Sequence, residues 1–248
     1  EFFSRKQILG RDTRVKNALR NSDHRVLSSH DAHQDLKEFF MVRSGVNIYI
    51  YHFVSIIDDL EQVNMEELKV KYRLPDDYFL ISNQFHKHKN HRVLFLALAR
   101  LKEMGIRKHM AITGKFPDAT DSPYMAELHR IIDDNHLQDQ ISMLGIISRN
   151  DQLQLMKHSQ AVIQPSLFEG WSTVIEDARS LQVPVVAANL GVNMEQLGED
   201  EVYFDPHNTD ELVAILKDYP ERNMEEKPYE DYEVRVKEAA RTLMRIFQ

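Results

Sequence analysis

Between Tyr78 and Tyr219 the chain alternates short apolar runs with longer segments of helical character, and this alternation limits the choice of fold. The apolar runs span roughly four to six residues, as buried strands do, and the segments between them roughly eight to fourteen. No Asn-Gly or Asp-Gly pair joins two runs as a hairpin would. The pattern therefore predicts an α/β fold, a Rossmann-like doubly wound parallel sheet with helices on both faces.

The boundaries of these elements follow from apolar residues and flanking turn residues. Strands are predicted over residues 78–82, 109–113, 140–144, 161–165, 183–188 and 201–204, and helices over 91–104, 124–134, 150–158, 174–181 and 209–219. A loop containing Gly191 is expected after residue 188. Parallel strands end at one edge of their sheet, where ligands bind. The loops expected at that edge are 83–90, 114–122, 145–150 and 166–173.

The loop before the helix 174–181 is the one best suited to bind an anion. It contains a carboxylate, a glycine, the only tryptophan and two hydroxyls: Glu169, Gly170, Trp171, Ser172 and Thr173. The helix that follows offers free backbone N–H groups and a partial positive charge. Glu169 at the end of a buried strand needs a partner, for which a ligand hydroxyl is one candidate. Trp171 can equally pack on the edge of the sheet.

Glu176 has two interpretations. It can bind a ligand, or it can be the third helical residue of a capping box in which Thr173 is the N-cap.

The loop 83–91 is locally basic in an acidic protein. Lys89 can face a diphosphate together with the N–H groups of the next helix. Alternatively the loop is a solvated turn in which Asn90 caps that helix. His86, His88 and His91 also suggest a metal site, but their spacing matches no known zinc pattern, so no metal is expected.

Several classes of function are disfavoured by what the chain lacks. It has neither a GxGxxG nor a Walker sequence, which argues against a nicotinamide enzyme or an NTPase, and Gly114-Lys115 alone is a weak signal. The 248 residues carry a formal net charge of −8, so no global basic field is available for nucleic acid. No cysteine is present and no apolar run approaches the ~20 residues of a membrane span. A cytoplasmic protein that binds no nucleic acid is expected.

Three regions are expected along the chain. Residues 1–57, with strands predicted at 25–28 and 46–54 around a helix at 32–40, are too small to hold a core alone. Because the chain begins with Glu1, they are expected to be the remnant of an N-terminal domain. Residues 58–220 form the main α/β domain, and residues 221–248 form a closing helix that packs back toward the N-terminal part.

The segment 165–178, PSLFEGWSTVIEDA, resembles the signature of GT-B glycosyltransferases of family 4. That signature reads Pro-Ser, then Glu-Gly-aromatic, then a second Glu that opens a helix. Residues 183–187 resemble the strand that follows it, and residues 81–90 resemble the family's Gly-Arg-Leu…Lys-Gly loop. Residues 112–115 and 143–145 lie where the family has its next two strand ends.

This resemblance implies a retaining transferase that uses a nucleotide-diphosphate sugar as donor and needs no metal or other cofactor. It implies that 1–57 belong to the acceptor domain and that 58–220 form the GT-B C-terminal, donor-binding domain. The acceptor is expected to be a carbohydrate or a lipid-linked glycan. Peripheral membrane association through the N-terminal domain and the oligomeric state stay open. Two alternatives remain, a nucleotide-sugar-binding module without transfer activity and a GT-B-like epimerase.

The resemblance also implies roles for individual residues. Glu169 would meet hydroxyls of the donor sugar, Glu176 would hold the ribose, and Lys89 would neutralise the diphosphate. The expected catalytic residues are Glu169 and Lys89, and the expected donor-binding residues are Gln84, Lys89, Gly114, Ile147, Glu169, Gly170, Trp171, Ser172, Thr173, Val174 and Glu176. Two departures stand out. Six residues rather than the family's seven separate the glutamates, and Gln84 replaces the family's arginine, whose charge a neutral amide lacks.

Overall fold

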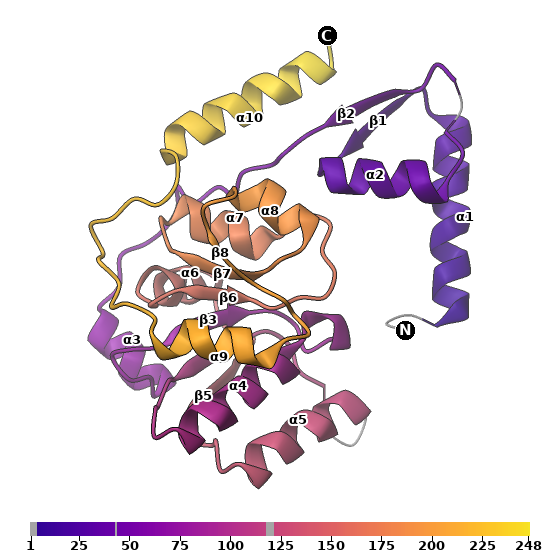
Figure 1. Cartoon of the computed structure of the whole chain (residues 1–248). Helices are drawn as coiled ribbons and strands as arrows, with labels where there is room; N and C mark the ends of the chain where they lie inside the picture. Colours follow the sequence, from indigo (N-terminus) through magenta and orange to yellow (C-terminus); the bar gives the residue numbers. More distant parts are fainter. Residues whose placement is uncertain (1–3, 43, 118–121) are drawn as a thin grey trace.

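A computed structural model of the chain describes residues 4–42, 44–117 and 122–248 (Figure 1). Part of the predicted loop 114–122, residues 118–121, lies outside this description. The elements are, in order, α1 (Arg5–Asn21), β1 (His24–Leu27), α2 (His30–Phe39), β2 (Asn47–Ile50), α3 (Met65–Tyr72), β3 (Phe79–Ser82), a 3-10 turn η1 (Lys87–Lys89), α4 (His91–Glu103), β4 (Met110–Thr113), α5 (Pro123–Asp134), β5 (Ile141–Gly145), α6 (Arg149–Lys157), β6 (Val162–Gln164), α7 (Thr173–Ser180), β7 (Val185–Ala188), α8 (Gly191–Leu197), β8 (Val202–Phe204), α9 (Thr209–Lys217) and α10 (Tyr232–Ile246).

The main sheet has six strands in the order β5-β4-β3-β6-β7-β8, and every neighbouring pair is parallel. The chain starts in the middle with β3, adds β4 and β5 on one side, and then returns to add β6, β7 and β8 on the other. The order therefore reverses between β3 and β6. This arrangement confirms the predicted doubly wound fold and makes the edge beyond β3 and β6 the place for a ligand.

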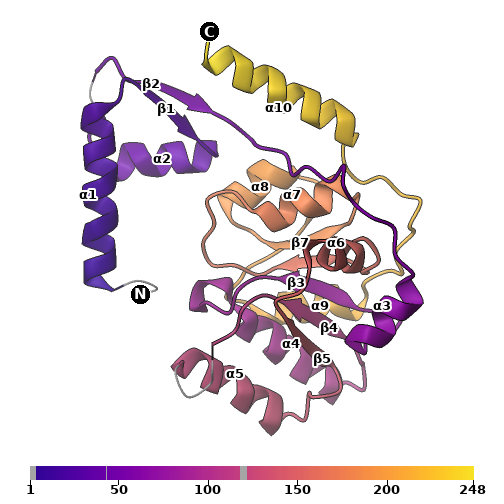
Figure 2. The same cartoon turned by 180° about the vertical axis from the view of Figure 1, so that it is seen from behind.

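Alternate residues of each strand pack against different helices, because successive strand side chains point to opposite faces. Phe79 and Ile81 of β3 contribute to a core shared with α4, α5 and α9. Leu80, between them, packs in a second core with α3, α6 and α7. Figures 1 and 2 show these two helical layers on opposite faces of the sheet. Each fully buried aliphatic side chain contributes about 1.5–3 kcal/mol to such cores.

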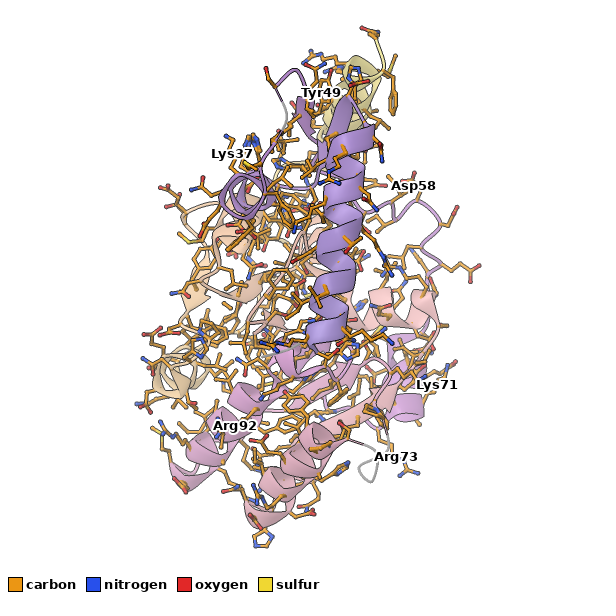
Figure 3. The ribbon with its side chains drawn as sticks, turned by 90° about the vertical axis from the view of Figure 1, so that its right-hand side faces the viewer. Lys37, Tyr49, Asp58, Lys71, Arg73 and Arg92 are labelled. Atoms are coloured by element: carbon orange, nitrogen blue, oxygen red, sulfur yellow. The ribbon has the colours of Figure 1, made fainter. Side chains whose placement is uncertain are left out.

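The N-terminal elements include a sheet of their own, and we call residues 4–57 of the described part the N-terminal unit. Here β1 and β2 pair as a two-stranded parallel sheet. Figure 3 views this unit from its outer side, with α1 in front, Lys37 of α2 to its left and Tyr49 of β2 at its upper end. Phe39 and Met41 remain largely exposed. A parallel pair of strands needs cover on both faces, and this unit provides little of it.

Two predicted elements differ from the structure. The strand predicted over 46–54 is shorter, because β1 ends at Leu27 and the chain beyond Tyr51 has no neighbouring strand. The loop predicted around Gly191 is helix α8, whose inward side carries the polar residues Asn193 and Gln196. The Nδ2 of Asn193 donates to the carbonyl of Ala188. Buried polar residues of this kind hide the apolar period of a helix.

None of the helices in the described ranges is long and apolar enough to cross a membrane.

Candidate active site at the carboxyl edge of the sheet

The loops that follow β3 and β6 border a pocket of about 340 Å³ at the point where the strand order reverses. Its lining combines residues from both loops with the first turn of α7: Ser82, Asn83, Gln84, His86, Lys89, Glu169, Trp171, Ser172, Thr173 and Val174. Two segments about 80 positions apart in the sequence thus form one cavity. Seven of the predicted site residues line it: Gln84, Lys89, Glu169, Trp171, Ser172, Thr173 and Val174.

Lys89 and Glu169 form an ion pair inside this pocket. Their Nζ and Oε1 atoms lie 2.5 Å apart, and Glu169 is 10% exposed. The Nε2 of Gln164 also donates to Glu169 Oε1, at 2.6 Å. Gln164 is fully buried and accepts a hydrogen bond from Asn83 Nδ2 at 2.9 Å. The carboxylate is therefore held by a chain of amides that crosses from β3 to β6.

Sequence reasoning missed Gln164 and Asn83 as supports of Glu169. The available signal was a polar residue inside an apolar strand, which needs a buried partner.

The first turn of α7 presents an open anion site. Ser172 is the N-cap, and its Oγ accepts from the N–H of Ile175 at 3.3 Å. The N–H of Ser172 is already bonded to Gln196 Oε1, at 3.1 Å. The N–H groups of Thr173 and Val174 have no acceptor among the described residues. These two N–H groups are thus open to a ligand.

The capping box predicted with Thr173 as N-cap and Glu176 as its partner is wrong. The helix begins one residue earlier than expected, so Ile175 occupies the third helical position. The carboxylate of Glu176 instead accepts hydrogen bonds from Arg235, from Arg179 at 3.0 Å and from Gln196 at 2.8 Å. Glu176 is fully buried and does not line the pocket. The structure does not bring it together with Lys89 and Glu169.

Asp177 is the acidic residue that sequence reasoning overlooked. Seven residues separate it from Glu169, which is the interval that the resemblance implies. Asp177 is 2% exposed and accepts two hydrogen bonds from the Arg149 guanidinium, at 2.5 and 2.6 Å, and one from Ser55. Hydrogen bonding to Asp177 raises the pKa of Arg149. Arg149 opens α6 directly after the loop that contains Ile147, so Asp177 faces that loop.

Gln84 and Trp171 line the pocket, whereas Gly114, Gly170 and Ile147 do not. Gln84 Oε1 is 3.0 Å from His86 Nε2. Gly114 has a φ of +128°, and a Cβ there would lie 2.4 Å from the carbonyl oxygen of Asn83, so only glycine lets the end of β4 approach the pocket loop. Ile147 packs on the second core rather than in the pocket. The carbonyl of Gly170 accepts hydrogen bonds from the N-terminal unit, and Trp171 stacks on a ring from that unit.

The histidines of the first loop stack on other rings, and the side chain of Asn90 contacts Pro206. His91 stacks on Phe85, with ring centroids 4.1 Å apart, whereas His86 and His88 stack on each other. In the described ranges no group of three His, Cys, Asp or Glu side chains is placed to hold a metal ion. Asn90 occupies the N-cap position of α4, as predicted, but it has a left-handed conformation and its side chain donates to the carbonyl of Pro206 instead of capping the helix.

Burial gives His91 a predictable effect on stability. Burial, followed by the charge of Lys89, lowers its pKa from an ordinary 6.5 to about 3. The unfolded chain therefore binds more protons than the folded chain below pH 6.5, and stability falls as the pH drops from there. From pH 7 to pH 5 we expect this group to remove about 2 kcal/mol from the free energy of unfolding. Urea unfolding at the two pH values measures the loss.

A His91→Phe variant keeps a flat buried ring and should lose most of this acid sensitivity. His129, exposed on α5, supplies the control substitution His129→Gln, which should leave the acid sensitivity as in the original chain. An equal loss of stability in the His91→Phe variant and the original chain would contradict the assignment.

Comparison with known proteins adds a family profile and curated relatives. The profile described as Glycosyl transferases group 1 matches residues 64–242. EpsF of Bacillus subtilis, named as a glycosyltransferase, is 28% identical over 126 residues, which cover 50% of this chain and 31% of EpsF. The serotype-specific mannosyltransferase WbdA of Escherichia coli is 22% identical over 194 residues, covering 76% of this chain and 23% of WbdA. The matches thus span a third or less of the length of these relatives.

Solved structures share the fold. HepE of Anabaena, determined in complex with UDP and glucose, superposes with a TM-score of 0.76 at 19% identity, over 98% of this chain and 68% of HepE. Sucrose-phosphate synthase of Thermosynechococcus elongatus superposes with a TM-score of 0.72 at 17% identity, over 95% of this chain and 62% of that protein.

Proposed function

The chain belongs to the glycosyl transferases group 1 family, and from this membership we propose that it supplies the donor-binding part of a retaining glycosyltransferase. The donor is a nucleotide-diphosphate sugar, and the acceptor is a carbohydrate or a lipid-linked glycan. The observation that supports this function best is the pocket in which Lys89, Glu169 and the open N–H groups of α7 face one another. The UDP complex of HepE and the mannosyltransferase name of WbdA agree with such a donor.

The proposed chemistry uses charge stabilisation rather than a metal or other cofactor. Lys89 and the N–H groups of Thr173 and Val174 bind the diphosphate, with Gln84 as a neutral donor beside them. The bond between the anomeric carbon and the β-phosphate oxygen breaks, and a bond to an acceptor hydroxyl oxygen forms on the same face of the sugar. The hydroxyl proton passes to the departing diphosphate. Fixed donors that meet the growing negative charge lower the barrier.

Donor binding replaces the ion pair between Lys89 and Glu169. The diphosphate attracts the ammonium group, and the carboxylate is released to accept hydrogen bonds from sugar hydroxyls. Gln164 keeps Glu169 oriented during this exchange, because its amide hydrogen bond does not depend on Lys89. A neutral sugar and an anionic diphosphate thus each receive a suitable partner.

We assign the ribose to Asp177 rather than to Glu176. Glu176 already accepts hydrogen bonds from three side chains in a fully buried position. Asp177 has the family interval from Glu169 and faces the loop of Ile147, which would frame the base. The guanidinium of Arg149 covers Asp177 and is itself half-exposed, so it can move aside for the ribose hydroxyls.

Calorimetric titration with UDP-glucose and GDP-mannose tests the proposal. We expect one of them to bind, and Asp177→Asn to weaken that binding roughly tenfold through loss of a charged hydrogen bond. Glu176→Gln should change the affinity less than about twofold. The absence of binding by either nucleotide sugar would refute the function, and the reverse pattern in the two variants would return the ribose to Glu176. Proton NMR that shows inversion of a sugar centre in the free donor would favour the epimerase alternative.

A further inference from the structure

The turn between β1 and α2 holds the loop that carries Trp171. The hydroxyls of Ser28 and Ser29 both donate to the carbonyl of Gly170, at 3.2 and 3.1 Å. Ser29 is also the N-cap of α2, and its Oγ accepts from the N–H of Ala32 at 3.0 Å. Ser29 is fully buried. One serine thus fixes both the start of α2 and the loop beside Glu169.

A second set of contacts reaches the same loop through a stacked pair of rings. His52, just beyond β2, lies parallel to Trp171, with centroids 4.3 Å apart and planes within 2°. The Nε2 of His52 lies 2.8 Å from Glu195 Oε1 on α8. Trp171 is buried and is also one of the residues that line the donor pocket. The position of its ring therefore depends on His52.

Glu195 joins this pair to the N-terminus of α2. Its two carboxylate oxygens accept the backbone N–H groups of His30, at 2.7 Å, and Asp31, at 3.1 Å. These are helix-terminal donors that lack partners within α2. Burial acts to raise the pKa of Glu195, but the hydrogen bonds from His30, Asp31 and His52 outweigh it and lower the pKa below its ordinary value. The carboxylate is thus charged at neutral pH.

We propose that His52 and Glu195 are positioning residues for the donor pocket, which hold Trp171 in place and make its position depend on the contact between α2 and α8. This inference rests on the proposed function, because it assigns the pocket to a donor. Glu195 keeps its backbone donors only while α2 abuts α8. Separation of the N-terminal unit would remove those donors, the ring stack and the two serine hydrogen bonds together. The donor loop is then complete only when the two parts of the chain are in contact.

The charged groups around His52 come from four elements. They are His30 and Asp31 on α2, Glu195 on α8, Glu176 and Arg179 on α7, and Arg235 and Glu238 on α10. Among these groups Glu195 is the one that lies within hydrogen-bonding distance of the imidazole, whereas Glu176 is paired with Arg179 and Arg235. Glu195 is therefore the group expected to hold the ring of His52 in its stacked position.

The fluorescence of Trp171 tests the inference directly, because it is the only tryptophan in the chain. An indole that loses a stacked ring and becomes more exposed to water emits at longer wavelength. His52→Ala should therefore shift the emission maximum of Trp171 to longer wavelength. Glu195→Gln, which keeps the shape and removes the charge that holds the imidazole, should produce a smaller shift in the same direction.

Two variants of His52 separate the stack from the hydrogen bond. His52→Phe keeps a flat ring on Trp171 and should leave its emission maximum as in the original chain. His52→Ala should shift the emission and also weaken the binding of UDP-glucose, or of GDP-mannose if that is the donor bound, roughly three- to tenfold. His52→Phe should restore that affinity to within about twofold. His129→Phe is the matched control on an exposed helix and should change neither quantity.

An emission maximum that stays in place in His52→Ala or in Glu195→Gln would overturn the inference. Unchanged donor affinity in His52→Ala would do the same. These failures differ from failure of the proposed function. Emission that shifts in both variants, in a chain that binds no nucleotide sugar, would refute the donor pocket while leaving the link between Glu195, His52 and Trp171 intact.

Discussion

Replacing Lys89 by methionine is expected to weaken the binding of the nucleotide-sugar donor about a hundredfold. Removal of one member of a close charge pair typically costs 2–5 kcal/mol of binding. Here two effects add, because the diphosphate loses its cation and the carboxylate of Glu169, which lies 2.5 Å from the Lys89 ammonium, becomes uncompensated. Methionine retains the length of the apolar stem. Calorimetry with the nucleotide sugar that the original chain binds measures the change.

Lys87, in the same 3-10 turn, supplies the matched control. It is exposed and does not line the pocket, so Lys87→Met should alter the affinity less than about threefold. The double variant Lys89→Met, Glu169→Gln should bind the donor diphosphate better than Lys89→Met alone, because the repulsion from Glu169 is gone. Equal losses in the two lysine variants would mean that the whole loop supplies a diffuse positive charge and that Lys89 has no special place.

Replacing Arg235 by methionine is expected to lower the free energy of unfolding by about 3 kcal/mol, because the loss of one partner leaves a buried carboxylate poorly compensated. Arg235 is 5% exposed, and Glu176 is fully buried. Arg235 is also the buried residue of α10, so its contact with Glu176 secures that helix to the main domain. Equilibrium unfolding in urea measures the loss.

The double variant Arg235→Met, Glu176→Gln should recover most of this loss, because the buried charge is then removed together with its partner. Lys237, two positions later on α10, forms an exposed pair with Glu233 and is the control. Lys237→Met should change the free energy of unfolding by less than about 0.5 kcal/mol. A loss in Arg235→Met no larger than that in Lys237→Met would show that solvent reaches Glu176.

The proposed donor site and the N-terminal unit meet at one loop. Glu169 faces the pocket, Gly170 accepts the serine hydroxyls, and Trp171 stacks on His52. Three successive residues thus contact the pocket, the N-terminal unit, or, in the case of Trp171, both. A substitution in this loop should therefore alter donor binding and the contact with the N-terminal unit together.

Much of the fold could be predicted because its signals are local. Apolar runs bounded by turn residues identified the strands of the main sheet, and the connecting helices had their apolar periods. The parallel sheet then required the strand ends to meet at one edge, which brought the loops of Lys89 and Glu169 together without any knowledge of side-chain contacts. Helix α8 and the short β2 escaped prediction because they depend on neighbours, namely the buried amides of α8 and the end of β1.

The sequence by itself determined the doubly wound sheet, the edge at which such sheets bind ligands, and the presence there of a carboxylate, a cation and a helix N-terminus. Only the tertiary structure decided that Glu176 faces Arg235, whereas Asp177 faces Arg149. One step along an α-helix rotates the side chain by about 100°, so Glu176 and Asp177, which are consecutive residues of α7, point to different sides. The side chain of Glu176 is paired with Arg235, 59 positions later in the chain, and no sequence pattern near Glu176 predicts this partner.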